Sequence, residues 1–382
     1  MNGKKRRNRI ITLIMLMVLA LTAAFAACGG ESWHKLQAPT NLQISGKTLI
    51  WDKVENSVGY LVNIDGKEKT TPKNTYDLSS FTVAGKYEIK VIALGDGKKY
   101  WDSVWSEVKE YAVENLEYSL SDKGTVYTVK GIGTVTSKEI DVPATFNGLP
   151  VVEIGIKAFE NNVNITKVTL PKNLSTINNL AFTGCTALEF IDLPDGLQYI
   201  GMRAFSGTAL KTLSIPDSVY NVSGSIVDNC VNLEYIKLPN GINDIYSRFF
   251  YNTPKLKSVT LPESVSFIGP EAFVGSSIES IKIPKNVWGI YESAFENTKI
   301  RSIEFEKGSV LESIYEKAFK GCSNIKSIVI PATVKGMGES VFYGWGKDQT
   351  IYVETLTEKP FGWSEKWSDG CNAKVVWGYK SV

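Results

Sequence analysis

The stretch that decides the fold runs from Leu188 to Phe205 and reads LEFIDLPDGLQYIGMRAF. Within it, Ile191-Asp192-Leu193 alternates apolar and polar residues, which predicts a very short β-strand. Pro194 ends the pairing of this strand, because proline has no amide hydrogen to donate. More apolar residues follow at intervals up to Phe205. A strand of this length has no core of its own, so the fold depends on whether the pattern returns along the chain.

The pattern returns from Pro143 to the C-terminus with a period of about 23 residues. Nine units can be counted, and their consensus is L-x-x-I-x-L-P-x-x-V-x-x-I-x-x-x-A-F-x-x-C. One unit lacks the phenylalanine, and its vacant register is assigned to Asp228. The phenylalanines are Phe159, Phe182, Phe205, Phe250, Phe273, Phe295, Phe319 and Phe342. The prolines are Pro171, Pro194, Pro216, Pro239, Pro262, Pro284 and Pro331, with Glu306 replacing proline once.

A single unit of this length cannot enclose a core, because a chain of ~23 residues is far too short to bury its own apolar side chains. Stacked units can share one continuous core, which is how repeats of this length form solenoids. The sequence therefore predicts a mainly β fold whose larger part is a solenoid of about nine coils, each of 22 to 24 residues.

The repeat resembles the BspA-like, or treponemal-type, leucine-rich repeats in its Ile-Gly-x-x-Ala-Phe and Leu-Pro signatures. Ile268-Gly269-Pro270-Glu271-Ala272-Phe273 is the clearest copy, and the resemblance covers about 115–382. Proteins of this family are surface adhesins that bind host matrix proteins, host cells or other bacteria. The resemblance implies a function of that class for this chain.

Both ends of the repeat array depart from the consensus, as the ends of a stacked core must. Tyr118–Val129 and Val142–Val151 resemble the opening hairpin of the same repeat proteins and are expected to cap the first coil. The final segment, 348–382, lacks the repeat and is rich in tryptophan, which predicts a cap over an open core. The solenoid with its opening hairpin is assigned to 114–347.

The N-terminus has the features of a secretory signal peptide over residues 1–27. Five basic residues precede an apolar run, Ile10–Leu21, that is too short for a comfortable membrane span. Small residues then lead to Cys28 in a stretch that resembles a bacterial lipobox, with Phe25 where that family usually has leucine. The resemblance implies a lipoprotein anchored through Cys28 to the extracellular face of the bacterial cell membrane.

A second interpretation of this segment stays open, since cleavage after Ala26 would release a freely secreted protein. In either case residues 28–36 form a tether, of which Gly29–Lys35 spans only ~25 Å when extended. Five of the 42 basic residues lie in the signal peptide, which leaves about 37 against 40 acidic residues and a net charge of about −3. No basic block remains for phosphate contacts, so nucleic acid is not expected as a partner.

Residues 37–113 contain period-2 segments separated by turn signals, a pattern typical of an antiparallel sandwich. The succession of Trp51, Tyr60-Leu61-Val62 and Tyr87–Ala93 resembles a fibronectin type III domain. The resemblance implies that the tryptophan packs at the centre of the core and that the later tyrosine hydrogen-bonds backbone at a corner. Because such folds host many functions, a spacer is favoured over a ligand site.

Four cysteines remain beyond Cys28, and Cys185, Cys230 and Cys322 share one column of the repeat. Coils stack ~4.8 Å apart, so Cys185 and Cys230, which are two coils apart, are expected to lie ~10 Å apart. This exceeds the ~7 Å limit between the α-carbons of a disulfide. The three are therefore predicted to be buried free thiols, and Cys371 in the cap is also expected to be free.

The sequence offers little catalytic chemistry. His34 is the single histidine and lies in the tether, so a Ser-His-Asp or Cys-His device would have to recruit it from outside both domains. Two carboxylates can act as acid and base, but a short stacked coil offers no deep pocket to raise the pKa of one of them. We therefore expect no enzymatic activity, no cofactor and no metal.

The outward residues of the stacked strands are predicted to form two columns on one face. Most of them are small or charged, and Phe190 and Tyr235 are the exceptions, two coils apart, with Asp192 and Lys237 beside them. Exposed aromatic residues often anchor interfaces, but single apolar surface residues are also ordinary. The first column is Lys167, Phe190, Thr212, Tyr235, Ser258, Ser280, Ser302 and Ser327. The second is Thr169, Asp192, Ser214, Lys237, Thr260, Lys282, Glu304 and Val329.

A second group of aromatic residues arises where the glycine after the repeat isoleucine is replaced. The replacements are Tyr246, Tyr291 and Tyr315, and Trp288 lies nearby in the sequence. These side chains are candidates for a partner site on one flank, although packing between neighbouring coils is the favoured interpretation.

These features predict a monomeric cell-surface protein that uses its solenoid to bind an extracellular protein or glycan. The leading hypothesis is adhesion to macromolecules of a host or of neighbouring cells. The alternative is capture of glycans or scaffolding of other envelope proteins. Aromatic stacking sites with few charges would favour a glycan, and a patch able to bury more than ~1,000 Å² would favour a protein.

Overall fold

The computed structural model describes residues 33–380, and over that range it contains strands and turns but no helix. The chain divides into two compact units, with the boundary between Val113 and Glu114. The predicted signal peptide, 1–27, and the predicted lipidation site, Cys28, lie outside the described residues.

The N-terminal unit contains two antiparallel sheets and one short parallel pair. One sheet has the strand order β2-β3-β6, the other β5-β4-β7-β9, and β1 pairs with β8. The strands are β1 (His34–Lys35), β2 (Gln43–Ser45), β3 (Thr48–Ile50), β4 (Gly59–Ile64), β5 (Lys67–Thr71), β6 (Thr75–Asp77), β7 (Gly85–Leu94), β8 (Tyr100–Trp101) and β9 (Lys109–Val113).

Aromatic side chains organise the core of this unit. The Trp51 and Tyr60 rings meet edge to face at 5.1 Å, and both residues are buried. The Tyr60 hydroxyl accepts a hydrogen bond from the Val54 amide at 2.9 Å. The Tyr87 hydroxyl donates to the Val83 carbonyl at 2.8 Å. The Tyr60 ring is thus buried and the Tyr87 ring partly buried, and each hydroxyl group bonds local backbone.

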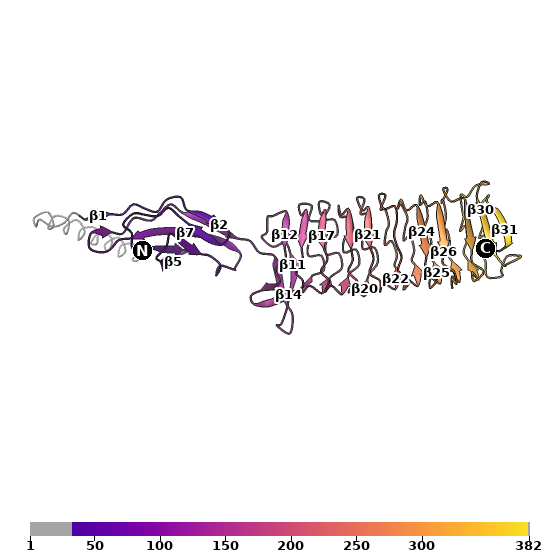
Figure 1. The fold of residues 1–382 in the computed structure, drawn as a ribbon, viewed down its shortest axis with the longest axis horizontal. Helices are drawn as coiled ribbons and strands as arrows, with labels where there is room; N and C mark the ends of the chain where they lie inside the picture. The colour runs from indigo at the N-terminus through magenta and orange to yellow at the C-terminus, as the bar shows by residue number, and fades with distance from the viewer. Residues whose placement is uncertain (1–32, 381–382) are drawn as a thin grey trace, which may run out of the picture. The chain divides into compact units, whose positions relative to one another are not determined.

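The C-terminal unit is a solenoid with one row of strands on each of two opposite sides (Figure 1). The first row contains β12 (Glu139–Asp141), β15 (Lys167–Thr169), β17 (Phe190–Asp192), β19 (Thr212–Ser214), β21 (Tyr235–Lys237), β24 (Ser280–Ile283), β26 (Ser302–Phe305), β28 (Ser327–Ile330), β30 (Thr350–Glu354) and β31 (Lys374–Tyr379). The second row contains β11 (Tyr127–Gly131), β14 (Leu149–Ile154), β16 (Thr176–Ile177), β18 (Tyr199–Ile200), β20 (Asn221–Val222), β22 (Asp244–Ile245), β23 (Phe267–Ile268), β25 (Gly289–Ile290), β27 (Ser313–Ile314) and β29 (Gly336–Met337).

Where neighbouring strands of a row pair, they pair in parallel and equivalent repeat residues face each other; within the described residues, the first row consists of four such sheets and the second of two. In the first row Phe190 pairs with Lys167, and in the second row Ile177 pairs with Ile154 and Ile200. We number the coils from coil 1, which contains Phe159, to coil 9, which contains Phe342. Each coil contributes one position to each column, so a residue type that recurs in the sequence becomes a column in space.

The turn around each phenylalanine follows one backbone conformation. The residue two places before the phenylalanine position has a φ of 52 to 62° in all nine coils, although none of these residues is glycine. The residue two places after it has a φ of 53 to 85° and is always glycine or asparagine, the types that tolerate this left-handed region. The first set is Lys157, Leu180, Arg203, Ser225, Arg248, Glu271, Ser293, Lys317 and Ser340. The second is Asn161, Gly184, Gly207, Asn229, Asn252, Gly275, Asn297, Gly321 and Gly344.

The phenylalanines form a stacked ladder inside the solenoid. Ring centroids of neighbouring coils lie 5.0 to 5.7 Å apart, and the ring planes are within 22° of parallel. Trp345 and Trp367 meet the last ring, Phe342, edge to face. The core therefore runs from coil to coil and ends under tryptophans, as the composition of 348–382 predicted.

The assignment of Asp228 to the vacant phenylalanine register is wrong. The Phe205 amide donates to the Ile226 carbonyl at 3.0 Å, as the Phe182 amide does to the Ala204 carbonyl at 2.8 Å. Ile226 therefore occupies the alanine position, and the buried Val227 occupies the phenylalanine position. The spacing from Phe205 is 22 residues, the short end of the repeat range.

Valine interrupts the ring ladder between coils 4 and 5, and the second row of strands also breaks here, whereas β19 and β21 pair across the same junction in the first row. Within residues 33–380, the ring ladder has no contact across this junction, and the Val227 amide makes no backbone hydrogen bond of the kind that Phe205 and Phe250 make. The strands β20 and β22 are also unpaired with each other, so the second row splits into two sheets at this point.

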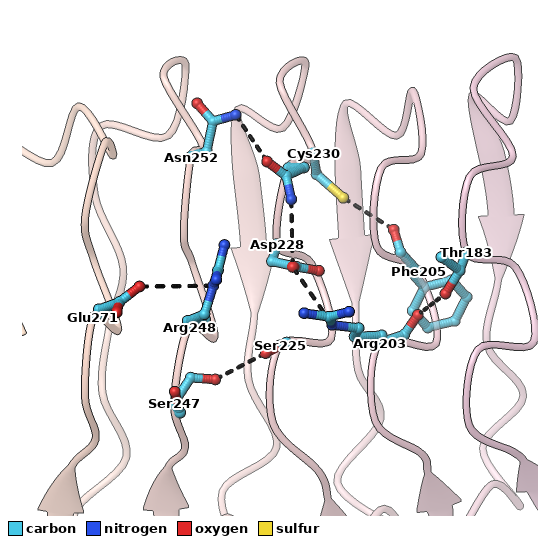
Figure 2. Close-up of polar contacts among 11 residues, drawn as sticks. Thr183, Arg203, Phe205, Ser225, Asp228, Cys230, Ser247, Arg248, Asn252 and Glu271 are labelled. Atoms are coloured by element: carbon cyan, nitrogen blue, oxygen red, sulfur yellow. Dashed lines mark hydrogen bonds and ion pairs between the residues drawn. The ribbon is translucent and has the colours of Figure 1, made fainter.

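Asp228 is a buried carboxylate beside this junction (Figure 2). The Arg203 Nε atom lies 3.9 Å from its Oδ2 atom, and the Asn229 amide group donates to Oδ2 at 3.4 Å. Its Oδ1 atom has no hydrogen-bond partner. Because the Arg203 side chain is 45% exposed, water screens its attraction to the carboxylate. Asp228 thus buries a charge with incomplete compensation.

We expect Asp228→Ser to stabilise the solenoid by about 1 kcal/mol, because the change removes an incompletely paired buried charge. Serine already occupies the equivalent buried position of coil 3, Ser206. The urea midpoint of unfolding measures the effect. The exposed residue Asp195, changed in the same way, should alter stability by less than about 0.5 kcal/mol. A clear loss of stability in Asp228→Ser would contradict this account of the site.

The solenoid has about eleven turns, so the expected count of nine is not confirmed. The strand β10 (Glu117–Leu120) forms a hairpin with β11, and β11 adds a rung before β14. A short hairpin between β13 (Thr145–Phe146) and β14 closes the same end. At the other end Trp363 pairs with Met337 and adds a further rung. These additions lack the repeat consensus, which is why the sequence period does not count them.

Candidate functional site

The first row of strands presents a polar face on which two aromatic rings are exposed. Phe190 of β17 is 61% exposed and Tyr235 of β21 is 55% exposed. Thr212 of β19, on the coil between them, pairs directly with Tyr235. The alternation inside each strand buries the middle residue and turns the outer two toward solvent. Both aromatic side chains therefore lie on the face that the sequence predicted.

A shallow groove of about 660 Å³ crosses this face beside the two rings. Asp192, Tyr235 and Lys237 line it, so the structure brings three of the four predicted residues of this group into one place, and Phe190 borders it on β17. Thr212 and Ser214, which the sequence placed in the two outward columns, also line the groove. The sequence did not point to its other polar residues, Asp195, Asp217 and Ser218, because they are ordinary surface residue types.

Charges in the groove are organised by a local ion pair. The Lys237 Nζ atom lies 3.4 Å from the Asp217 Oδ2 atom, and the Asn240 amide donates to Asp217 Oδ1 at 3.0 Å. The backbone hydrogen bond from Asn240 and the nearby Lys237 lower the pKa of Asp217. Asp217 is therefore ionised at neutral pH, and the groove offers paired charges, hydroxyl groups and the ring of Tyr235.

The second predicted group lies along the second row of strands, on successive coils. Tyr246 and Tyr315 are exposed and Tyr291 is half-buried, with ring centroids of Tyr291 and Tyr315 4.5 Å apart. Trp288 contacts Tyr291 at 5.8 Å. Phe267, which was not among the predicted residues, joins Tyr246 to the others at 5.7 and 5.4 Å. Its signal was present, since Phe267 precedes the repeat isoleucine at a position where Tyr199 is the one other aromatic residue among the nine coils.

The cysteines lie in one column inside the solenoid, as predicted. Cys185, Cys230 and Cys322 are buried free thiols. Each Sγ atom donates to the carbonyl of a phenylalanine-position residue of the preceding coil at 3.1 Å, the acceptors being Phe159, Phe205 and Phe295. Burial raises the pKa of Cys185 and Cys322 to about 12 and that of Cys230 to about 11. These thiols serve packing and have almost no reactive thiolate at neutral pH.

Thiol labelling of the folded chain at pH 8 should modify the half-buried Cys371 first, because the other three thiols are buried and protonated. After unfolding under non-reducing conditions, an Ellman-type titration should count four thiols beyond Cys28. A count of two or none would show that cysteines form disulfides and that the coils stack in another way.

Residues 33–380 contain no cluster of three or more His, Cys, Asp or Glu side chains that could hold a metal ion. The only histidine, His34, lies in the N-terminal unit with its ring 5.9 Å from Tyr100. The grooves on the described surface are shallow and lined by hydroxyl groups and ion pairs, a composition suited to surface recognition.

A family model described as BspA type leucine rich repeat region matches residues 152–279 and 243–359, with six copies of the repeat. Together these matches cover more than half of the 382 residues. The chain belongs to this family. Its repeats are therefore leucine-rich repeats, in agreement with the resemblance seen in the Leu-Pro and Ala-Phe signatures. Among curated proteins, no sequence matches the chain.

Several solved structures of bacterial leucine-rich-repeat proteins resemble the chain. A leucine-rich-repeat protein of T. pallidum is 26% identical, with 55% of this chain and 87% of that chain covered and a TM-score of 0.40. A leucine-rich cell surface protein of Faecalibacterium prausnitzii is 21% identical, with 71% and 95% covered and a TM-score of 0.37. The pneumococcal vaccine antigen PcpA is 18% identical, with 63% and 80% covered and a TM-score of 0.41. None of the described residues of our chain forms an apolar helix of membrane-spanning length.

Proposed function

We propose that this BspA-type repeat protein is a non-catalytic adhesion protein of the bacterial cell surface. Its solenoid binds an extracellular protein of a host or a neighbouring cell. The observation that carries the proposal is the pair of exposed rings, Phe190 and Tyr235, on a face whose neighbouring outward residues are polar. These neighbours are Lys167, Asp192, Thr212, Ser214 and Lys237. Aromatic residues are enriched among the anchors of protein interfaces.

The sheet face supports a protein partner through its extent as well as its rings. A protein interface buries about 800 Å² on each partner, with aromatic anchors near its centre and a polar rim. The outward columns continue on both sides of Phe190 and Tyr235, with alternating lysines, acidic residues and hydroxyl groups. This arrangement provides a rim of hydrogen-bonding groups around two aromatic anchors.

The N-terminal unit serves, in this proposal, as a fibronectin type III-like spacer between the membrane and the solenoid. Its antiparallel sheets of three and four strands, the Trp51–Tyr60 pair and the hydrogen bond from Tyr87 to Val83 support the assignment. A lipid on Cys28 would hold the spacer at the extracellular face of the membrane. The basic segment, the apolar run and the small residues before Cys28 support this anchor.

The anchor is tested by metabolic labelling with a fatty-acid probe. The wild-type chain should incorporate the probe and Cys28→Ala should not, because only a cysteine at the cleavage site can carry the lipid. When cells are fractionated, Cys28→Ala should be found in the medium and not with the membrane. Equal labelling of both chains, or complete release of the wild-type chain, would contradict the lipoprotein assignment.

The sheet-face site is tested with Phe190→Ala and Tyr235→Ala in the mature chain carrying Cys28→Ala. Against the first ligand identified on an array of host matrix proteins, each change should weaken binding roughly five- to thirty-fold, or about 1–2 kcal/mol. The melting temperature should change little, because both rings are more than half exposed. Tyr220→Ala removes an exposed ring from the second row and should bind as wild type does. Unchanged affinity in both sheet-face variants would exclude this site.

A further inference from the structure

A continuous row of five aromatic side chains follows the second row of strands over coils 5 to 8. We call it the aromatic strip, and it consists of Tyr246, Phe267, Trp288, Tyr291 and Tyr315. Phe267 contacts Tyr246, Trp288 and Tyr291 at ring distances of 5.7, 6.4 and 5.4 Å. Tyr291 then stacks on Tyr315, with the ring planes 13° apart. The rings therefore form one connected surface that runs along the solenoid axis.

Glycines beside the strip give the rings their space. A β-carbon on Gly289 would lie 3.3 Å from the Tyr291 Cε2 atom, so this ring lies against the glycine backbone. On the coil after Tyr315, the positions equivalent to Gly289 and Tyr291 are Gly336 and Gly338. No side chain from these two positions covers the outer face of the Tyr315 ring. The strip is thus packed at Phe267 and Tyr291 and open at its end.

The exposed aromatic area of the strip is narrow. Tyr246, Trp288 and Tyr315 are 40, 37 and 39% exposed. Large aromatic side chains offer about 150–250 Å² each when fully accessible, so these three present roughly 200–300 Å². Because the rings follow one line of coils, the strip matches a narrow ligand whose flat apolar faces rest on a few rings.

The groups around the strip are hydrogen-bonding and acidic. Asp244 accepts a hydrogen bond from the Ser266 hydroxyl at 2.6 Å, and it lies close enough to Tyr246 to help burial raise the pKa of that phenol. Glu292 is exposed on the coil of Tyr291, and Glu312, on the coil of Tyr315, pairs with Lys335 at 3.2 Å. Carboxylates accept hydrogen bonds from hydroxyl groups and repel anionic ligands.

Aromatic platforms also bind single-stranded nucleic acids, but those platforms lie in positively charged grooves. Here Lys335 is paired with Glu312 and Lys317 with Glu316, and Asp244 and Glu292 add negative charge. With nucleic acids disfavoured, neutral sugars remain as the class of ligand for this strip. They have flat apolar faces and many hydroxyl groups that donate hydrogen bonds. The repeat distance of the coils, ~4.8 Å, also brings a new ring under a linear chain at short, regular intervals.

We propose that the aromatic strip is a carbohydrate-binding site for a chain of neutral sugars. The sugar rings stack on Trp288 and on the open end at Tyr315. Their hydroxyl groups donate to Asp244 and Glu292 at the edges. The site is separate from the sheet face around Phe190 and Tyr235, and it allows the protein to hold a glycan on one row and a protein on the other.

Affinity electrophoresis of the mature chain carrying Cys28→Ala tests the proposal. Native gels contain laminarin, yeast mannan, galactomannan or hydroxyethylcellulose as neutral polysaccharides, and polygalacturonate or heparin as acidic ones. At least one neutral polysaccharide should retard the chain, and the acidic ones should not. Trp288→Ala and Tyr315→Ala should each weaken the retardation at least about fivefold, and the double variant should lose it.

The controls keep the result specific to the strip. Tyr220 occupies the same column as Trp288 on coil 4 and is 67% exposed outside the strip, so Tyr220→Ala should retain binding. Phe190→Ala should also retain it, which separates this site from the sheet face. The melting temperature of each variant shows whether it is folded. If the double variant is misfolded, the retardation of the two single variants tests the proposal. Retardation by no neutral polysaccharide, by acidic polysaccharides alone, or equally in wild type and single variants would overturn the proposal.

Discussion

A coil of about 23 residues buries its apolar side chains only against the coils on either side of it, and the rest of the structure depends on this constraint. The phenylalanine ladder is its clearest expression, with ring centroids 5.0 to 5.7 Å apart between neighbouring coils. Each ring is held in place by backbone hydrogen bonds to the next coil, such as that from the Phe250 amide to the Ala272 carbonyl. Because every coil needs neighbours, the two ends require side chains outside the repeat, which the opening hairpin and Trp345, Trp363 and Trp367 provide.

The same constraint explains why much of the fold could be predicted from the sequence. Positions that meet the next coil are restricted to apolar residues of one size, so Ile191, Leu197 and Phe205 recur in register and reveal the solenoid. The cysteine column could be predicted for the same reason. The family match then confirms the leucine-rich repeat independently of these arguments. The end turns could not be counted, because residues at a cap meet a neighbour on one side only and follow no period.

Errors and omissions arose where the repeat changed its length and where an outward position carried an unusual side chain. Asp228 stands 23 residues after Phe205, but a coil shortened by one residue places Val227 in the core. The backbone hydrogen bond from Phe205 to Ile226 reveals this shift. The cysteine column agrees, since Cys230 stands three residues after Val227, as Cys185 does after Phe182. Phe267 escaped notice because its position points outward and varies freely between coils. The outward columns predicted exposure of Phe190 and Tyr235 correctly, whereas the groove beside them depends on ordinary residues such as Asp217.

The junction between coils 4 and 5 has a mechanical consequence. Hydrogen bonds between coils run along the solenoid axis, so a pull on the two ends loads all junctions in series, and the weakest one opens first. At this junction the core position is Val227, and the strands β20 and β22 are unpaired with each other. Tension would therefore open the second row first at this junction, while the β19–β21 pairs of the first row still hold coils 4 and 5 together. The solenoid would hinge at one place, and the remaining coils would stay folded under the load.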